Sequence, residues 1–447
     1  MTSPLRTPSE TETVTKPRGP SGLPRLLAGV SSPERMSLAE HLVVHGPPPL
    51  AHRRPRREHP ALIDQIEQAG LRGHGGAGFP TATKMRAVTA SRRRPVLVVN
   101  AAEGEPASLK DRTLTHMLPH LVLDGGVLAA EAIGATEVIV SICEDARASI
   151  ESIAEAIAER ESSGRRGPRT RLTTVPANYV AGQESALVNH LNGAPAIPTF
   201  TPPMPFQQGV ARRPTLISNV ETLAHVALIA RHGPSWFRQL GTPSQPGSTL
   251  LTLSGPVAHP GVYEIECGAS LASLITAAGG TVARPRALLL GGYGGSWIGE
   301  EQLSGLLLAD EYLSEYGATV GAGVTLLLSD SACPVAETVR LARWLTRQSS
   351  GQCGPCVHGL EALATNLQEI GRGVAQVGAN QRIARLAALV QGRGACRHPD
   401  GAARLILSAM DTFGDEFADH AQHGPCDRCL SPPELPLPPT YKPVSNR

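Results

Sequence analysis

Apolar and polar residues follow two periodic patterns along residues 61–233. Short segments rich in β-branched residues have the pattern of strands and lie at 95–100, 137–143 and 169–175. Longer segments with apolar residues three and four positions apart have the pattern of helices and lie at 111–133, 146–160 and 220–231. Strands that alternate with helices build layered α/β structures. We therefore predict an α/β domain over residues 61–240.

The pattern changes after residue 247. Strand-like segments, two of them beside Gly-Pro and Pro-Gly turns, lie at 250–254, 262–266, 287–290 and 324–328. Only the segment 270–278 has helical spacing. This succession predicts a small β-rich α+β domain over 247–330, with a hairpin and one helix.

Helical spacing dominates from residue 334 onward. Segments long enough for an antiparallel bundle are separated by glycine-rich breaks and lie at 335–347, 357–371, 380–390 and 402–417. We predict a helical domain over 334–423, followed by a Cys- and Pro-rich tail over 424–447. Ser, Thr, Pro and charged residues dominate 1–58, for which we predict a disordered arm with helical spacing only at 36–44.

Composition and charge narrow the classes of function. A chain of 447 residues is long enough for about three domains. Aromatic residues make up only 3%, so stacking platforms for bases or sugars are few. The net charge of +2 gives no indication of a nucleic-acid partner. No apolar stretch approaches the ~20 residues that span a membrane, and residues 1–20 lack the apolar core of a signal peptide. We predict a cytoplasmic protein without a membrane span.

The eight cysteines are too few for a disulfide framework and are unevenly placed. Three stand alone, and we expect them to be buried, inert thiols: Cys143, Cys267 and Cys333. The others crowd into the last quarter of the chain, where Cys353-x2-Cys356 is followed by Cys396. This spacing is typical of a metal site. A redox thiol pair is one alternative, and zinc with His358 or His398 as a further ligand is another.

A glycine-rich segment begins at Gly73 and contains the formal pattern G-x-G-x-x-G, with Lys84 following. The dinucleotide fingerprint needs a strand before it, whereas residues 62–69 have helical spacing, so an ordinary Rossmann site is excluded. The glycines still allow the backbone to approach a phosphate or a flat ring. A surface loop with several positive φ angles is the alternative.

Two further motifs place polar residues at the ends of predicted strands or the starts of helices. Asn100, Glu103 and Glu105 follow a buried strand, at the edge where α/β folds bind ligands. Segments 179–187 and 214–222 begin helices with polar residues. These residues either cap the helices that follow or hold the polar edge of a ring cofactor.

Taken in their order along the chain, the motifs resemble those of the NADH-oxidising flavoprotein subunit of respiratory complex I and its relatives in NAD-linked hydrogenases and formate dehydrogenases. The resemblance spans roughly 61–420 and marks this chain as a divergent member. It implies an FMN- and NADH-binding α/β domain, a ubiquitin-like β-grasp (SLBB) domain and a helical domain with a [4Fe–4S] cluster. Electrons would pass from NAD(H) or NADP(H) to FMN, to the cluster, and on to a ferredoxin-like or other redox partner.

The resemblance also assigns residues. For FMN it implies Gly73, Gly75, Gly76, Lys84, Asn100 and Glu103, with Tyr179, Gly182, Glu184, Ser218 and Asn219 completing the flavin and nicotinamide side. Phe79 and Glu105 match positions that face the pyridine nucleotide. The cluster ligands would be Cys353, Cys356 and Cys396. Because binding and electron transfer by cofactors need no acid or base, no catalytic side chain is assigned.

Several positions depart from the family pattern. His74, Ala102 and Gln183 stand where the family has Arg, Asp and Glu. Ala87 and Met204 replace two of three phenylalanines around the adenine, at a loss of about 0.5–1.5 kcal/mol per ring pair. We therefore expect nucleotide binding to be weakened more than flavin binding. An alternative function is a non-enzymatic scaffold or assembly subunit that has lost NADH oxidation.

Ser350 stands where the family has the first cysteine of its cluster motif. Three interpretations follow for the fourth iron. Ser350 itself is a ligand, the cluster has three irons or a labile fourth one, or Cys426 or Cys429 takes the place of the missing thiol.

Overall fold

The computed structural model describes residues 22–49, 59–164 and 167–438. Its first part holds a parallel sheet in the order β3-β2-β1-β4. The strands are β1 (Val96–Ala101), β2 (Glu137–Cys143), β3 (Arg169–Val175) and β4 (Thr215–Asn219). The central strand β1 is apolar and buried almost throughout, as expected for a parallel sheet covered on both faces.

The helices of this part connect and cover the sheet. They are α2 (His59–Ala69), α3 (Thr81–Thr89), α4 (Lys110–Met117), α5 (Pro119–Ile133), α6 (Arg147–Ser162), α7 (Glu184–Leu191), α8 (Val220–His232) and α9 (Pro234–Phe237). The segment 111–133, expected as one helix, is divided at Leu118. Pro119 has no backbone N–H and begins α5 as its first residue.

The second part is a mixed sheet in the order β6-β5-β9-β7-β8. Its strands are β5 (Ser248–Ser254), β6 (Gly261–Glu266), β7 (Pro285–Leu290), β8 (Ser296–Gly299) and β9 (Val324–Ser329). The first and last of them, β5 and β9, pair in parallel at the centre, and the other neighbours are antiparallel. Short helices α10 (Leu271–Ala277), α11 (Glu300–Leu303) and α12 (Asp310–Leu313) lie between the strands.

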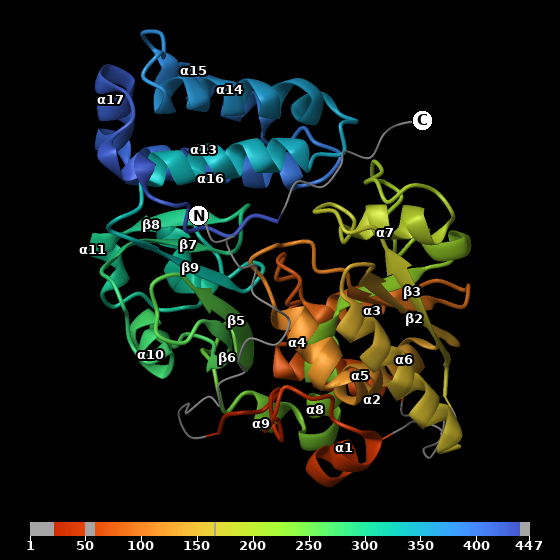
Figure 1. Ribbon diagram of the computed structural model, residues 1–447. Coiled ribbons are helices and arrows are strands. Elements are labelled where there is room, and N and C mark those ends of the chain that lie inside the picture. The colour runs from red at the N-terminus through yellow and green to blue at the C-terminus, as the bar shows by residue number, and fades with distance from the viewer. Residues whose placement is uncertain (1–21, 50–58, 165–166, 439–447) are drawn as a thin grey trace.

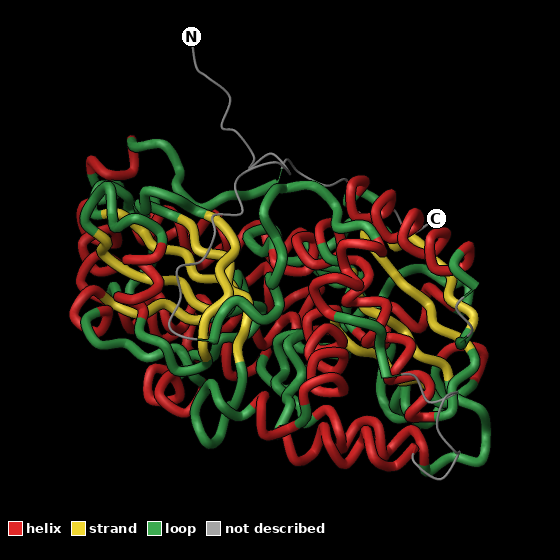
Figure 2. The backbone as a smooth tube through the Cα atoms, turned by 90° about the horizontal axis from the view of Figure 1, so that it is seen from below, coloured by secondary structure: helices red, strands yellow, loops and turns green. Residues whose placement is uncertain are grey.

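The third part is helical. It contains α13 (Pro334–Arg347), α14 (Leu360–Gly371), α15 (Ala379–Val390), α16 (His398–Thr412) and α17 (Gly414–His423). These helices lie above the mixed sheet in Figure 1, beside the parallel α/β part. Figure 2 shows the two sheets on opposite sides of the molecule, with helices and loops between them. One apolar core joins the helices to Leu289 and Leu326 of the mixed sheet.

Part of the N-terminal arm is ordered, contrary to the expectation for 1–58. Leu26 and Leu27 are buried, and the backbone N–H groups of residues 25–27 all donate to the Glu264 carboxylate of β6. Buried leucines and a charged acceptor for three amides fix a segment whose composition is otherwise polar. Residues 1–21 and 50–58 lie outside the described part of the chain.

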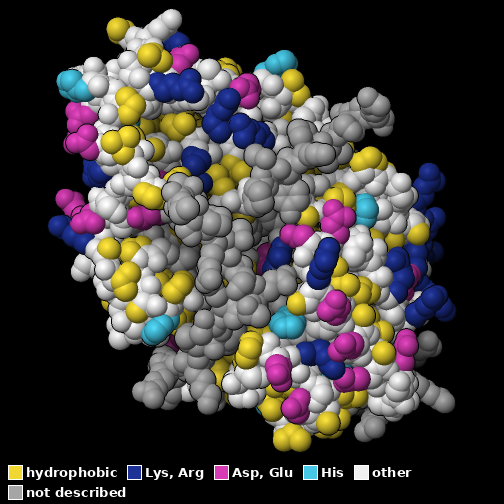
Figure 3. All heavy atoms as spheres, in the orientation of Figure 1, with side chains coloured by type: hydrophobic (Ala, Val, Ile, Leu, Met, Phe, Trp, Pro, Cys, Tyr) yellow, Lys and Arg dark blue, Asp and Glu magenta, His cyan; other side chains and the backbone are white. Residues whose placement is uncertain are grey.

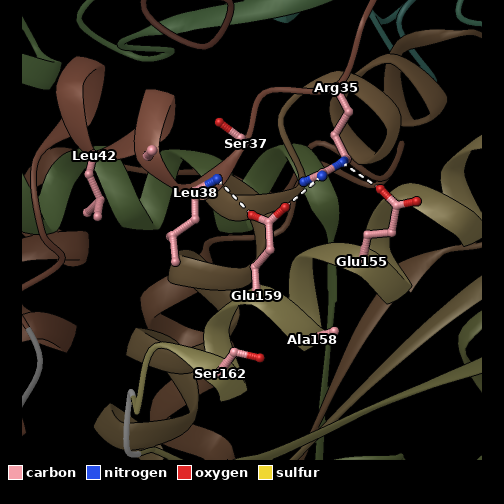
Figure 4. A pocket seen from close by; sticks show the side chains of 9 residues that line it. Arg35, Ser37, Leu38, Leu42, Glu155, Ala158, Glu159 and Ser162 are labelled. Atoms are coloured by element: carbon pink, nitrogen blue, oxygen red, sulfur yellow. Dashed lines mark hydrogen bonds and ion pairs between the residues drawn. The ribbon is translucent and has the colours of Figure 1, made fainter.

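The helix α1 (Leu38–His45) completes this N-terminal segment. Ser37 and Glu40 form a capping box at its start. Arg35 pairs with Glu155 at 3.0 Å and with Glu159 at 2.6 Å, and Glu159 also accepts from the Leu38 N–H (Figure 4). These contacts tie α1 to α6.

Candidate functional site

The parallel sheet has a topological switch point between β1 and β4. The chain leaves β1 toward β2 and β3 on one side and returns to its other side as β4. Asn100 and Asn219 are register partners at the carboxyl ends of these two strands. Open α/β sheets bind ligands in the crevice at such a point. Two predicted site residues therefore lie side by side where a ligand is expected.

The glycine-rich loop lies over this edge of the sheet. A Cβ atom on Gly75 would lie 3.4 Å from the Asn219 Cβ. The Gly73 N–H donates to the Phe79 carbonyl at 2.9 Å, and the His74 N–H donates to Thr222 Oγ1 at 2.9 Å. Gly76 has a φ of +99°, which disfavours any other residue there. The loop is thus fixed at both ends while Gly75 and Gly76 face solvent.

A buried charged cluster supports the loop from below. Lys110 Nζ lies 2.6 Å from Glu221 and 3.0 Å from Asp111, and it donates to the His74 carbonyl at 3.0 Å. Glu221 also pairs with His74 Nδ1 at 3.0 Å. Burial opposes ionisation of Glu221, but His74 and Lys110 outweigh it and hold its pKa well below the usual range. Glu221 lies within the segment 214–222, but nothing in the sequence indicated that it meets Lys110.

The start of α7 meets the end of β1 at the same edge. Asn100 Nδ2 donates to the Gly182 carbonyl at 2.9 Å. A Cβ atom on Gly182 would lie only 2.3 Å from the Ala102 carbonyl oxygen, so this close approach requires glycine. Lys84 of α3 forms an ion pair with Glu184, the first residue of α7. Four separate segments of the chain therefore converge at the switch point: the glycine-rich loop, the end of β1, the end of β4 and the start of α7.

Some predicted polar residues also act as helix caps. Glu103 accepts from the Asp111 and Arg112 N–H groups at 3.1 Å each, in the first turn of α4. Asn219 Oδ1 accepts from the Glu221 N–H at 2.9 Å, while its Nδ2 donates to Asp111 at 2.5 Å. Gln183, at a position where the family has Glu, caps α7. Ser218 is paired with Val99 in the sheet register.

A cavity of about 250 Å³ lies beside the switch point and includes Glu105 and Tyr179 in its walls. Glu105 Oε2 accepts from the Tyr179 hydroxyl at 3.2 Å and from the Tyr293 N–H at 3.0 Å. Its Oε1 is buried and has no hydrogen-bond partner among the described residues. Phe79 is 53% exposed and is not among the cavity walls. The structure therefore brings Glu105 and Tyr179 together and leaves Phe79 apart.

Burial raises the pKa of Glu105 from 4.5 to about 7, against the hydrogen bonds from Tyr293 and Tyr179. The stability that its neutral form provides is complete below pH 4.5 and is lost as the pH rises through 7. We expect Glu105→Gln to remove this loss, which amounts to at most about 3 kcal/mol. Thermal unfolding at pH 5 and pH 8.5 checks this prediction. The melting temperature of the variant should exceed that of the native protein only at pH 8.5.

The exposed acid Glu301 provides the matched control. Glu301→Gln should leave the pH dependence of the melting temperature unchanged. Parallel pH profiles for the native protein and Glu105→Gln would contradict the expected titration of Glu105.

The three predicted cluster cysteines lie at two junctions of the helical part. Cys353 and Cys356 follow α13, with Cys356 in a π-helical turn (Pro355–Gly359), and Cys396 precedes α16. Burial, together with the nearby Cys353 and Cys396 thiols, raises the pKa of Cys356 to about 12. Cys353 and Cys396 therefore lie near Cys356. Ser350 is half-buried in the same loop.

This cysteine loop packs against the α/β part. Gln352 Nε2 donates to the Pro198 carbonyl at 2.9 Å, and the Tyr179 N–H donates to Gln348 at 3.3 Å. The Tyr179 ring meets His398 edge-on at 5.3 Å, two residues after Cys396. Tyr179 therefore contacts both the cavity and the cysteine site.

Two other cysteines lie elsewhere. Cys426 and Cys429 group with Cys333 and His420. The expectation that Cys333 is an isolated thiol is therefore wrong, because the fold brings together residues 87 positions apart. This grouping also argues against Cys426 or Cys429 as a substitute for Ser350.

Comparison with known proteins agrees with this geometry. The Nuo51 FMN-binding domain matches residues 66–228, and the NADH-ubiquinone oxidoreductase-F iron-sulfur binding region matches 336–420. An NADH-quinone oxidoreductase subunit of Rhizobium meliloti is 33% identical over 82% of this chain and 90% of its own length. The chain belongs to the family of NADH-quinone oxidoreductase subunits with a Nuo51 FMN-binding domain. The resemblance predicted from the motifs is thus confirmed, as are an FMN-binding domain and a C-terminal iron–sulfur region.

Another relative and a solved structure support this family assignment. The NADH-quinone oxidoreductase subunit of Streptomyces coelicolor is 33% identical over 80% of this chain and 82% of its own. A chain of an air-oxidised NAD⁺-reducing [NiFe]-hydrogenase has a TM-score of 0.78 at 31% identity, with 88% of this chain and 68% of that chain covered. Within the described ranges, no helix of this NADH-quinone oxidoreductase family member is both long and apolar enough to cross a membrane.

Proposed function

We propose that this protein is an NADH dehydrogenase subunit that binds FMN at the switch point and an iron–sulfur cluster at Cys353, Cys356 and Cys396. The convergence of the glycine-rich loop, Asn100, Gly182 and the Lys84–Glu184 pair on one sheet edge carries this proposal. FMN supplies the ability to accept a hydride and release single electrons. The protein binds, orients and separates the cofactors.

The residues at the switch point suit FMN. Exposed backbone at Gly75 and Gly76 allows close approach by a phosphate or a ring, and Lys84 supplies a cation for the phosphate. Asn100, Glu103, Ser218 and Asn219 offer amide, carboxylate and hydroxyl groups along the same edge. The cap contacts of Glu103 and Asn219 fix these two side chains before any ligand binds.

The nucleotide side is assigned to the cavity that contains Glu105 and Tyr179. The unpartnered Oε1 of Glu105 supports a polar ligand there. We propose NADH as the donor because the names of the relatives specify it. Ala87 and Met204 in place of aromatic residues predict weak adenine stacking.

The three cysteines fit a [4Fe–4S] cluster that is completed without a fourth thiolate. Ser350 lies in the same loop as Cys353 and offers a hydroxyl. Neighbouring Gly351, Gln352 and Gly354 are exposed, so an acceptor can approach this loop. We therefore propose a cluster with a labile or serine-bound fourth iron.

We propose the domain limits 61–240, 247–330 and 334–423, with a tail over 424–447. The middle domain is proposed as an SLBB-type β-grasp. In support, its first and last strands pair in parallel at the centre of a five-stranded sheet, and the helix α10 follows the β5–β6 hairpin. This is the strand order of ubiquitin-like folds.

We propose a ferredoxin-like or other redox protein with an acidic surface as the electron acceptor. Arginines line a groove of about 640 Å³ on the helical domain: Arg340, Arg343, Arg347 and Arg372. Figure 3 shows Lys and Arg side chains gathered on that domain. Opposite charges steer such encounters. We propose a cytoplasmic location, because none of the eight cysteines, all of which lie in the described residues, forms a disulfide, and the cytosol keeps thiols reduced.

Anaerobic spectroscopy of the purified protein tests the proposal. We expect a yellow-brown protein that releases FMN on denaturation, contains iron and sulfide, and loses its flavin absorbance when NADH is added. If NADPH bleaches the flavin and NADH does not, the electron donor is NADPH. A colourless protein that refuses added FMN and contains no iron would overturn the proposal in favour of a scaffold subunit.

A further inference from the structure

Four potential metal ligands lie together at the far end of the helical domain. Cys333 precedes α13, and His420 is in the last turn of α17. Cys426 directly precedes a short 3-10 turn (Asp427–Leu430) that contains Cys429. Their ligand atoms all lie within 4.8 Å of one another. The family match ends at residue 420, so Cys426 and Cys429 lie beyond it.

The distances between these atoms match a tetrahedral site. Zn–S bonds of about 2.3 Å and a Zn–N bond of about 2.0 Å place two sulfurs about 3.8 Å apart and a sulfur and a nitrogen about 3.5 Å apart. Cys426 Sγ and Cys429 Sγ are 3.8 Å apart. His420 Nε2 lies 3.6 Å from Cys333 Sγ and 4.0 Å from Cys429 Sγ.

The surroundings also suit bound thiolates. The Ala336 N–H at the start of α13 donates to Cys333 Sγ at 3.4 Å, as a helix N-terminus does for a thiolate. The Cys429 N–H donates to the Cys426 carbonyl at 2.9 Å, which closes the Cys-x2-Cys turn. His420 is only 2% exposed and directs Nε2 toward the sulfurs.

We propose that Cys333, His420, Cys426 and Cys429 bind one structural zinc ion. Three sulfurs and one imidazole nitrogen form a closed set of four ligands, which is typical of structural rather than catalytic zinc. Binding releases the thiol protons to solvent and leaves the metal in its Zn²⁺ state. This site is separate from Cys353, Cys356 and Cys396.

The zinc ion would anchor the segment that follows it. The Glu434 N–H donates to Glu337 at 2.7 Å, and the Glu434 carboxylate accepts from the Ser329 N–H at 2.9 Å. Leu435 is buried, and Pro436 and Leu437 form part of the cavity wall beside Glu105. The metal therefore fixes the start of a short strap over this cavity. That the cavity binds a nucleotide rests on the proposed function, whereas the zinc site does not.

Metal analysis of the anaerobically purified full chain tests the proposal. We expect about one zinc per chain in the native protein. Cys429→Ser and His420→Ala should each reduce zinc at least about tenfold and leave iron and FMN unchanged. Cys353→Ser should do the reverse, with iron lost and zinc retained. The buried thiol Cys267 supplies the matched control, and Cys267→Ser should retain both metals.

X-ray absorption at the zinc edge of the native protein gives a readout that needs no variant. We expect three sulfur neighbours at about 2.3 Å and one nitrogen at about 2.0 Å. A native protein without zinc, a zinc shell of oxygen, or loss of iron from Cys429→Ser would each overturn the proposal. Absence of FMN would refute the proposed function and leave the zinc result intact.

Discussion

Replacing Gly182 by alanine is expected to weaken FMN binding about 10- to 100-fold. The new Cβ would lie 2.3 Å from the Ala102 carbonyl oxygen and 3.5 Å from the Ala102 Cβ. Both neighbours belong to the segment that leaves β1, so the start of α7 must move away from it. This movement breaks the hydrogen bond from Asn100 to the Gly182 carbonyl and shifts the adjacent Glu184. Flavin content after purification and titration of the apoprotein with FMN measure the effect.

Gly414→Ala is the matched control for this substitution. Gly414 begins α17, has no positive φ, and a Cβ atom there would meet nothing within 4 Å. That variant should bind FMN like the native protein. Unchanged FMN affinity in Gly182→Ala would show that the flavin lies elsewhere.

Cys356→Ser is expected to lose the iron–sulfur cluster and to slow electron delivery to a protein acceptor at least about 100-fold. Cys356 is the buried member of the three cysteines, and iron–sulfur clusters are held by thiolates. NADH should still reduce the flavin, because the residues proposed to bind it lie at the edge of the parallel sheet and not at the cysteine loop. Iron content, stopped-flow flavin reduction and acceptor reduction separate these steps.

The converse variant, Ser350→Cys, supplies the thiol that the family motif has. We expect it to slow the loss of iron in air about tenfold, because a fourth thiolate protects the exposed iron. Cys356→Ser protein with a full complement of iron would contradict this assignment of ligands. Equal iron loss from the native protein and Ser350→Cys would refute the assignment of Ser350 to the missing ligand position.

The local patterns predicted most of the secondary structure. Strands β1, β2, β3, β5, β6, β7 and β9 follow their β-branched and apolar segments, whereas β4 and β8 were not predicted. The helix α2 confirms that no strand precedes Gly73. Polar residues at strand ends predicted where ligands would be sought, because the carboxyl edge of a parallel sheet is the place for them. Motif resemblance added the cofactors.

Contacts between distant segments could not be predicted in this way. Lys110 and Glu221 are 111 positions apart and meet only because β1 and β4 are neighbours. Leu26 and Leu27 lie in a polar segment, and their order depends on Glu264 of another domain. The approach of Cys333 to His420 depends likewise on how α13 packs against α17. The periodicity of a segment describes one element at a time. It gives no information on contacts between elements that are distant in the sequence.

The cavity beside Glu105 has walls from every part of the molecule: Glu105 and Tyr179 of the α/β domain, Thr252 of β5, Trp344 of α13 and Pro436 of the tail. A molecule bound there adds the free energy RT ln(1 + [L]/Kd) to the assembled state alone, about 2.7 kcal/mol at a hundred times Kd. Such a molecule therefore stabilises the contacts among the parts of the molecule that form the cavity. Saturating ligand should merge separate melting transitions into one, and any domain expressed alone would carry only a fragment of this site.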